Sequence, residues 1–182
     1  MNKIIRLALV LFAVSAIVAG VLGVVNELTY PVIDAQKQAK TAEAFASVLK
    51  ADRFDEIEFD NPDFPTVLTV HKAEGVGYVA TSKFSGAQGN ITMAVGVDND
   101  FKCTGISVIE HSETSGLGAN AASTAEVGVN FRAQFKGVDE HVQLKKAGGE
   151  IDALSGATIT SRSVTNATSA AIQFVEALQS AN

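Results

Sequence analysis

The sequence contains no tryptophan and a single cysteine, Cys103, among its 182 residues. One cysteine cannot form a disulfide within the chain, nor supply the thiolates of an iron–sulfur cluster or a Cys-based zinc site. We therefore expect Cys103 to be a buried structural thiol. The three histidines lack metal-ligand spacing, so no metal site is predicted.

Basic residues are also few, since 14 Lys and Arg stand against 20 Asp and Glu for a net charge of -6. An acidic chain without a basic stripe is not expected to bind nucleic acid. Hydrophobic residues make up 47% of the chain, which is normal for a folded protein. The length suits a membrane anchor followed by one domain.

Residues 7–25 form an apolar run that no charge interrupts. As a helix the run would rise roughly 28 Å, close to the thickness of a bilayer's hydrocarbon core. We predict a transmembrane helix here, in contact with the lipid bilayer. A cleaved signal peptide with a processing site at Val14-Ser15-Ala16 is the alternative, although the apolar run continues past that site.

Charges flank this run asymmetrically, with Lys3 and Arg6 before it and Glu27 and Asp34 after it. The positive-inside rule then predicts a single-pass protein of the cell (inner) membrane. Its N-terminus, residues 1–6, would be cytoplasmic, and everything after the helix would be extracytoplasmic.

The rest of the chain is predicted to adopt an α+β fold with an antiparallel sheet and packed helices in one extracytoplasmic domain. Residues 26–65 are predicted to be a linker, with a helix from Pro31 to residue 50 and then an acidic loop with room for one edge strand. The domain spans 66–182. It should contain four strands of an antiparallel meander, a helical segment, a short strand and a final helix, at 66–71, 75–81, 90–97, 101–109, 129–135, 142–145 and 160–180.

A stretch of small and hydroxyl residues, Asp152-Ala153-Leu154-Ser155-Gly156-Ala157-Thr158-Ile159-Thr160-Ser161, precedes the final helix. A tight turn entering a helix N-terminus offers unpaired N–H groups and the positive end of the helix dipole, which suit a phosphate. Ser and Thr at such a position are also ordinary helix caps. Local chemistry alone therefore leaves both a phosphate site and simple capping open.

A second polar stretch, His111-Ser112-Glu113-Thr114-Ser115-Gly116-Leu117-Gly118, directly follows the fourth predicted strand. Its glycines would let the backbone approach a ligand closely, and Glu113 and Thr114 add an acceptor and a hydroxyl. A polar loop with turn glycines is the alternative interpretation.

The pattern Asp152-x-x-Ser155-Gly156-Ala157-Thr158-x-Thr160-Ser161 resembles the signature at which FMN is attached through its phosphate to threonine. This signature occurs in the G subunit of the Rnf electron-transport complex and in the C subunit of the sodium-pumping NADH:quinone reductase. The order of the apolar helix, the loop at 111–118 and this signature is similar to that of the Rnf G subunits. Ser115 departs from the family, which usually has proline there.

The resemblance implies that Thr158 carries FMN as a covalent phosphoester, attached outside the cytoplasm by a separate flavin transferase with FAD as donor. Ser155, Gly156 and Ala157 would shape the turn, and backbone amides near Thr160 would face the phosphate. Asp152 would belong to the pattern that the transferase recognises. The flavin would lie against side chains of the second stretch, namely Glu113, Thr114 and Leu117.

The implied function is that of a membrane-anchored electron carrier in an Rnf-type complex. Such complexes couple electron transfer between ferredoxin and NAD to translocation of Na⁺ or H⁺, and the partners would be the other subunits, including membrane-embedded electron carriers. Protein contacts would tune the flavin, which supplies the redox chemistry. The alternatives are a stand-alone membrane-anchored flavin reductase and a binding ectodomain without flavin.

Overall fold

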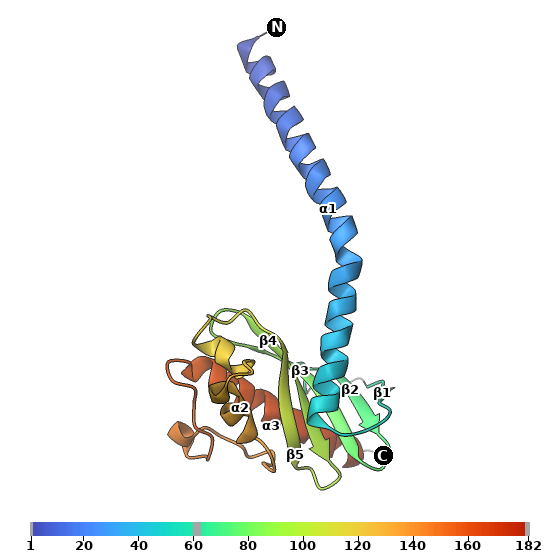
Figure 1. The fold of residues 1–182 in the computed structure, drawn as a ribbon, viewed down its shortest axis with the longest axis vertical. Coiled ribbons are helices and arrows are strands. Elements are labelled where there is room, and N and C mark those ends of the chain that lie inside the picture. Colours follow the sequence, from blue (N-terminus) through green and yellow to red (C-terminus); the bar gives the residue numbers. More distant parts are fainter. Residues whose placement is uncertain (1, 60–62, 181–182) are drawn as a thin grey trace. The chain divides into compact units, whose positions relative to one another are not determined.

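The computed structural model describes residues 2–59 and 63–180 (Figure 1). In chain order the elements are α1 (Lys3–Val48), β1 (Asp55–Ile57), β2 (Val67–Ala73), β3 (Gly77–Ser85), β4 (Asn90–Asp98), β5 (Cys103–Glu110), the 3₁₀ turn η1 (Gly118–Ala121), α2 (Glu126–Ala133), the 3₁₀ turn η2 (Lys145–Ala147) and α3 (Thr158–Ser180). The chain divides into two compact units, residues 1–39 and 40–182.

The first unit consists of helix α1 up to residue 39. Among the described helices, α1 is the one long and apolar enough to cross a membrane, as the run at 7–25 predicts. The expectation of a separate helix starting at Pro31 is wrong, because Pro31 lies inside one continuous helix. Proline favours a helix start but is also tolerated inside membrane helices, so the residue type alone did not decide between them.

The second unit is built on a five-stranded antiparallel sheet in the order β1-β2-β3-β4-β5. The predicted meander is confirmed, and β1 supplies the edge strand allowed for in the acidic segment. The turn between β4 and β5 is a hairpin held by Asp98, whose carboxylate accepts hydrogen bonds of 2.9 Å from the N–H groups of Asp100 and Lys102.

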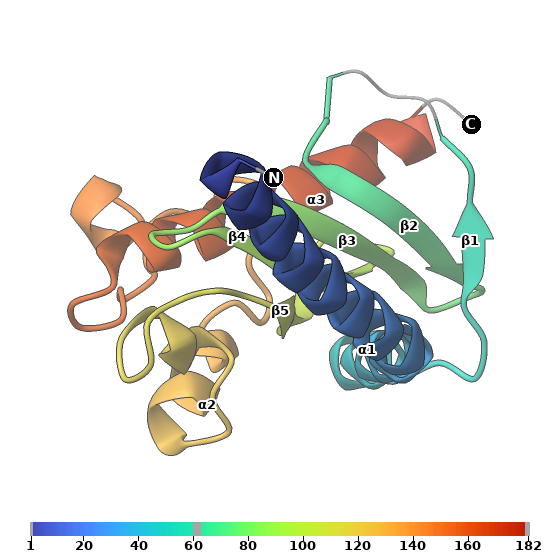
Figure 2. The same cartoon turned by 90° about the horizontal axis from the view of Figure 1, so that it is seen from above.

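Helix α3 covers one face of this sheet (Figure 2). Alternate side chains of β3 and β4, such as Ala80 and Val95, point toward this helix. They are buried against its apolar stripe, which includes Val164 and Phe174. Phe131 in α2 and Phe135 just after it join this core, as their spacing predicts. The packing holds the N-terminal end of α3 against loops at one end of the sheet.

The other face of the sheet is covered by the last turns of α1, whose Phe45 and Val48 pack on Val79 and Ala94. The helix end comes so close that a Cβ on Gly96 would lie 2.6 Å from the Val48 carbonyl oxygen. The Thr104 hydroxyl donates a hydrogen bond to the same carbonyl. Glycine at position 96 thus makes room for a helix terminus whose unpaired carbonyl needs a donor.

The segment before α3 differs from expectation. The sequence predicts a short strand at 142–145, but in the structure Leu144 forms an isolated bridge to Ile151, and η2 follows. The final helix begins at Thr158, two residues before the predicted start. Thr158 is therefore the first residue of the helix rather than part of the preceding loop.

Candidate functional site

The turn before α3 is held by hydrogen bonds of its own residues. The Ala157 N–H donates to the Leu154 carbonyl at 3.0 Å, and Gly156 adopts a φ of 72°, which favours glycine. The buried Ser161 hydroxyl accepts a hydrogen bond from the Leu154 N–H and donates one to the Ala157 carbonyl, both at 2.9 Å. Ser161 therefore fixes the turn and has no capacity left to donate to a ligand.

Three backbone amides are free of acceptors within the helix at this end. The first helical hydrogen bond runs from the Ser161 N–H to the Ala157 carbonyl, so the N–H groups of Thr158, Ile159 and Thr160 precede the regular ladder. Together with the helix dipole they favour an anion at this position.

The Thr158 hydroxyl is also available, because no described residue hydrogen-bonds to it and its side chain is half-buried. Thr160, Ser161 and Ser163 differ in this respect. Their hydroxyls donate to Glu113, to the Ala157 carbonyl and to the Ser85 carbonyl, respectively. Ser155 is exposed in the turn, so Thr158 is the partly buried hydroxyl of the stretch that remains open to chemistry.

Glu113 joins the second stretch to the start of α3. Its carboxylate is buried, accepts a hydrogen bond from the Thr160 hydroxyl, and accepts another from the Gln88 N–H at 3.0 Å. A Cβ on Gly86 or on Gly118 would overlap the same carboxylate oxygens. Glycines on two loops therefore leave space for this carboxylate. It connects the β3–β4 hairpin, the loop after β5 and the start of α3.

The charge state of Glu113 follows from these contacts. Burial by itself would raise the pKa of the carboxyl, but hydrogen bonds from the Gln88 N–H, the Thr160 hydroxyl and the Ala87 N–H outweigh it and lower the pKa below its ordinary value. Glu113 is thus an anion at neutral pH, and its acceptor capacity is used within the protein.

The rest of the second stretch forms a turn beside the Ser155-Gly156 turn. The Leu117 N–H donates to the Thr114 carbonyl at 3.2 Å, and Gly116 has a φ of 77°. Ser115 occupies the second position of this turn, where proline is favoured, so the turn forms with serine as well. Thr114 and Leu117 are exposed, and a Cβ on Gly156 would lie 3.0 Å from Leu117 Cδ2.

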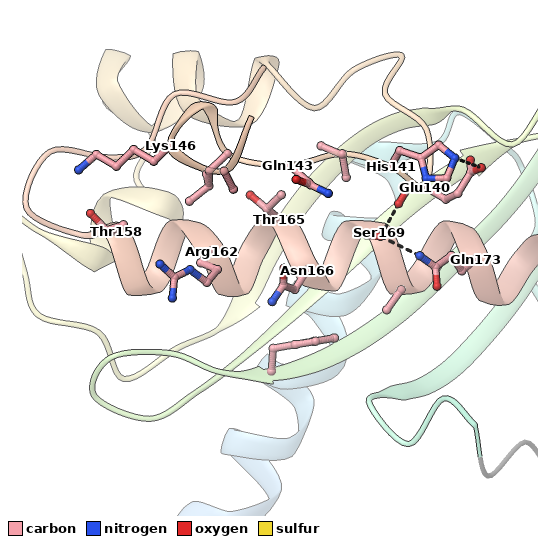
Figure 3. Close-up of a pocket in the computed structure, with 15 residues that line it drawn as sticks. Glu140, His141, Gln143, Lys146, Thr158, Arg162, Thr165, Asn166, Ser169 and Gln173 are labelled. Carbon is pink, nitrogen blue, oxygen red and sulfur yellow. Dashed lines mark hydrogen bonds and ion pairs between the residues drawn. The ribbon is translucent and has the colours of Figure 1, made fainter. Parts of the chain in front are cut away.

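A groove of about 520 Å³ runs along α3 from Thr158 (Figure 3). Arg162 and Lys146 lie at the end of the groove that holds Thr158, whereas Glu140 and His141 lie at the other end (Figure 3). Amide side chains of Gln143, Asn166 and Gln173 and the ring of Phe84 line the space between. The groove therefore combines polar and apolar walls with a cationic end, and its size suits a small molecule.

The predicted site residues thus fall into two groups. The turn at 155–158 lies beside Leu117, while Thr160 and Glu113 are hydrogen-bonded to each other and buried. Lys146 and Arg162, which line the groove near Thr158, were not among the residues predicted from the sequence. Arg162 could have been found, because residues four apart lie on one face of a helix. Lys146 comes from a separate segment, and no local signal places it near Thr158.

Within the described residues, no cluster of acidic, His or Cys side chains could hold a metal ion.

Comparison with known proteins matches two families. Residues 86–173 match the FMN-binding domain, and residues 1–48 match the RnfG N-terminal region. The G subunit of the ion-translocating oxidoreductase complex of Methanosarcina acetivorans is 35% identical, with 97% of this chain and 96% of that protein covered. The G subunit of the Na⁺-translocating ferredoxin:NAD⁺ oxidoreductase complex of Acetobacterium woodii is 31% identical, covering 95% and 92%.

Solved structures are also similar, among them that of the C subunit of the Na⁺-translocating NADH-quinone reductase from Parabacteroides distasonis. It is 21% identical in sequence and has a TM-score of 0.47 over 75% of this chain and 83% of that one.

Proposed function

The chain belongs to the family of G subunits of ion-translocating oxidoreductase complexes, and we propose that it relays electrons within such a complex through FMN bound covalently to Thr158. In this proposal the complex couples electron transfer between ferredoxin and NAD to translocation of Na⁺ or H⁺. Both ions occur in the names of relatives. The other subunits, including membrane-embedded electron carriers, are the partners of this chain.

The observation that carries the assignment to Thr158 is its free hydroxyl at a prepared anion site. The hydroxyl lacks a partner among the described residues, three helix amides lie beside it, and a groove opens from it. These features fit a phosphoester and the small molecule attached through it. A flavin transferase would form the bond from the Thr158 oxygen to the FMN phosphorus of FAD, with AMP as the leaving group.

The other site residues have supporting roles in this proposal. Ser155, Gly156 and Ala157 shape the turn, and the Thr160 amide faces the phosphate. Thr114 and Leu117 would contact the flavin, and their exposed side chains, with Leu117 beside Gly156, support this role. The Glu113 carboxylate already accepts hydrogen bonds from the Thr160 hydroxyl and the Gln88 N–H. We therefore assign Glu113 to positioning the helix end rather than to flavin contact.

When bound, FMN accepts and donates single electrons, and protein groups near it set its potential. A reversible site outside the cytoplasm would need free FMN to stay occupied. The covalent bond makes retention of FMN independent of its free concentration. In the proposed topology α1 anchors the protein in the cell (inner) membrane, residues 1–6 are cytoplasmic, and the flavin domain is extracytoplasmic. The proposed extents remain 7–25 for the membrane span, 26–65 for the linker and 66–182 for the flavin domain.

The test is made on the assembled complex in its native membrane. We expect ferredoxin-dependent NAD reduction, and the ion transport coupled to it, to be lost in Thr158→Ala while the variant chain still copurifies with the other subunits. Full ferredoxin-dependent activity in Thr158→Ala would contradict the electron-relay role. Turnover with a soluble acceptor by the isolated wild-type chain, without copurifying subunits, would instead support a stand-alone reductase.

A further inference from the structure

Two cationic side chains converge on the Thr158 end of the groove. Arg162 follows Thr158 by one helical turn, so both project from the same face of α3. Lys146 reaches the same end from η2, on the opposite wall of the groove (Figure 3). The two cations therefore flank the Thr158 hydroxyl from separate elements.

These two cations have no ion-pair partner within the described part of the chain. The neighbouring Lys145 differs, because its ammonium group lies 2.6 Å from the Asp152 carboxylate. The carboxylate in the groove belongs to Glu140, which lies at the far end, 3.2 Å from the His141 ring nitrogen. The groove is therefore polarised, with uncompensated positive charge beside Thr158.

We propose that Lys146 and Arg162 bind the phosphate of the flavin mononucleotide carried on Thr158. This inference rests on the proposed function and adds the residues that hold the anionic part of the ligand. A phosphodiester carries one negative charge, which a guanidinium can bind through two hydrogen bonds and an ammonium as a point charge. The free amides of α3 complete the ring of donors.

The two cations would affect the position of the attached flavin rather than formation of the covalent bond. A phosphoester bond alone leaves the flavin free to rotate about several single bonds. Two cations on opposite walls fix the phosphate against the mouth of the groove, which limits the positions that the rest of the ligand can reach. Lys146 and Arg162 thus act as positioning residues for the cofactor.

The experiment removes the covalent bond and measures the phosphate contribution directly. In the full-length Thr158→Ala chain in detergent, the dissociation constants of FMN and of riboflavin, which lacks the phosphate, are measured by flavin fluorescence. FMN should bind about three- to tenfold more tightly, as expected for two partly exposed ion contacts. This preference should shrink as salt is raised, because screening weakens exposed charges.

Matched variants distinguish the effect of the groove cations on the FMN preference from the effect of the overall charge of the chain. Adding Lys146→Gln and Arg162→Gln should lower the preference for FMN to less than about twofold, and the remainder is due to the α3 amides. Adding Lys50→Gln and Lys72→Gln, two exposed lysines outside the groove, should leave it unchanged. An unaltered preference in the groove variant, equal binding of both ligands by the parent, or no FMN binding up to about 1 mM would overturn the inference.

The covalent site is tested separately, on the wild-type chain. An FMN-sized mass on Thr158 in cells with a flavin transferase tests the proposed function and does not depend on Lys146 or Arg162. A wild-type chain without that mass, together with cation-dependent FMN preference in Thr158→Ala, would reject the covalent flavoprotein and retain the phosphate site.

Discussion

The Thr160 hydroxyl donates a hydrogen bond to the Glu113 carboxylate, 47 residues earlier in the chain. This contact joins the start of α3 to the loop after β5, and the second oxygen of Glu113 extends the connection to the β3–β4 hairpin through the Gln88 N–H. The helix end that presents Thr158 is thereby fixed by a buried anion. The two polar stretches of the sequence form one structural unit.

Replacing the donor should destabilise the domain. Thr160→Val keeps the shape but leaves a buried carboxylate oxygen without its donor, and we expect a loss of about 1.5–3 kcal/mol in the free energy of unfolding. Thr168→Val is the matched control, since the buried Thr168 hydroxyl donates to the Val164 carbonyl of its own helix and to no other described residue. Urea unfolding of the detergent-solubilised chain compares them, and equal losses would contradict the role of the Glu113 contact.

The same carboxylate predicts a pH dependence of stability. The pKa of Glu113 is lower in the folded protein than its ordinary value of 4.5, so its stabilising contribution is complete above that value and is lost as the pH falls through the folded pKa. The stability difference between wild type and Glu113→Gln should be largest above about pH 5 and shrink below about pH 4. Unfolding at a series of pH values measures it, and a difference that grows on acidification would refute the assignment.

Gly96 should be required for docking of the last turns of α1 on the sheet. Alanine at position 96 would press against the Val48 carbonyl, so we expect Gly96→Ala to lower stability by about 1–3 kcal/mol and to expose residues 44–49 to hydrogen exchange. Gly105 lies near the same helix end, but a Cβ there would be 3.6 Å from Val48 Cα, an ordinary contact. Gly105→Ala should therefore be tolerated better, and the reverse order would count against this packing.

Cys103 should be inert in the folded protein. Its side chain is buried, and burial raises the pKa of the thiol to about 12. Because the thiolate is the reactive form, alkylation by iodoacetamide at pH 8 should be roughly a thousandfold slower than for an unperturbed thiol. The measurement is intact mass against time with and without urea, and rapid alkylation without urea would contradict the burial of the thiol.

Much of the fold could be predicted from local patterns. The strands of the meander are short β-branched runs separated by Gly and Asp turns, and both signals act over a few residues. The continuous path of α1 through Pro31 could not be predicted, because proline is compatible with a helix start and with a helix interior near a membrane. The prediction of a short strand at 142–145 was wrong because a strand needs a partner along its length. Leu144 forms a single bridge, to Ile151.

The site was predictable only in part, since the sequence identifies residues but not their partners. The small-residue stretch pointed to Thr158, whereas the pairing of Glu113 with Thr160 depends on how the sheet brings distant loops together. Lys146 and Arg162 line the same groove for the same non-local reason, because they come from separate segments of the chain.

The most direct test of the central claim is the flavin content of the chain after denaturation. The wild-type protein and Thr158→Ala are isolated from native membranes, separated by denaturing electrophoresis, viewed under ultraviolet light and analysed by peptide mass. We expect a fluorescent wild-type band with an FMN-sized addition on Thr158 and a dark Thr158→Ala band. A dark wild-type band, or a fluorescent band that persists in Thr158→Ala, would contradict covalent FMN at this threonine.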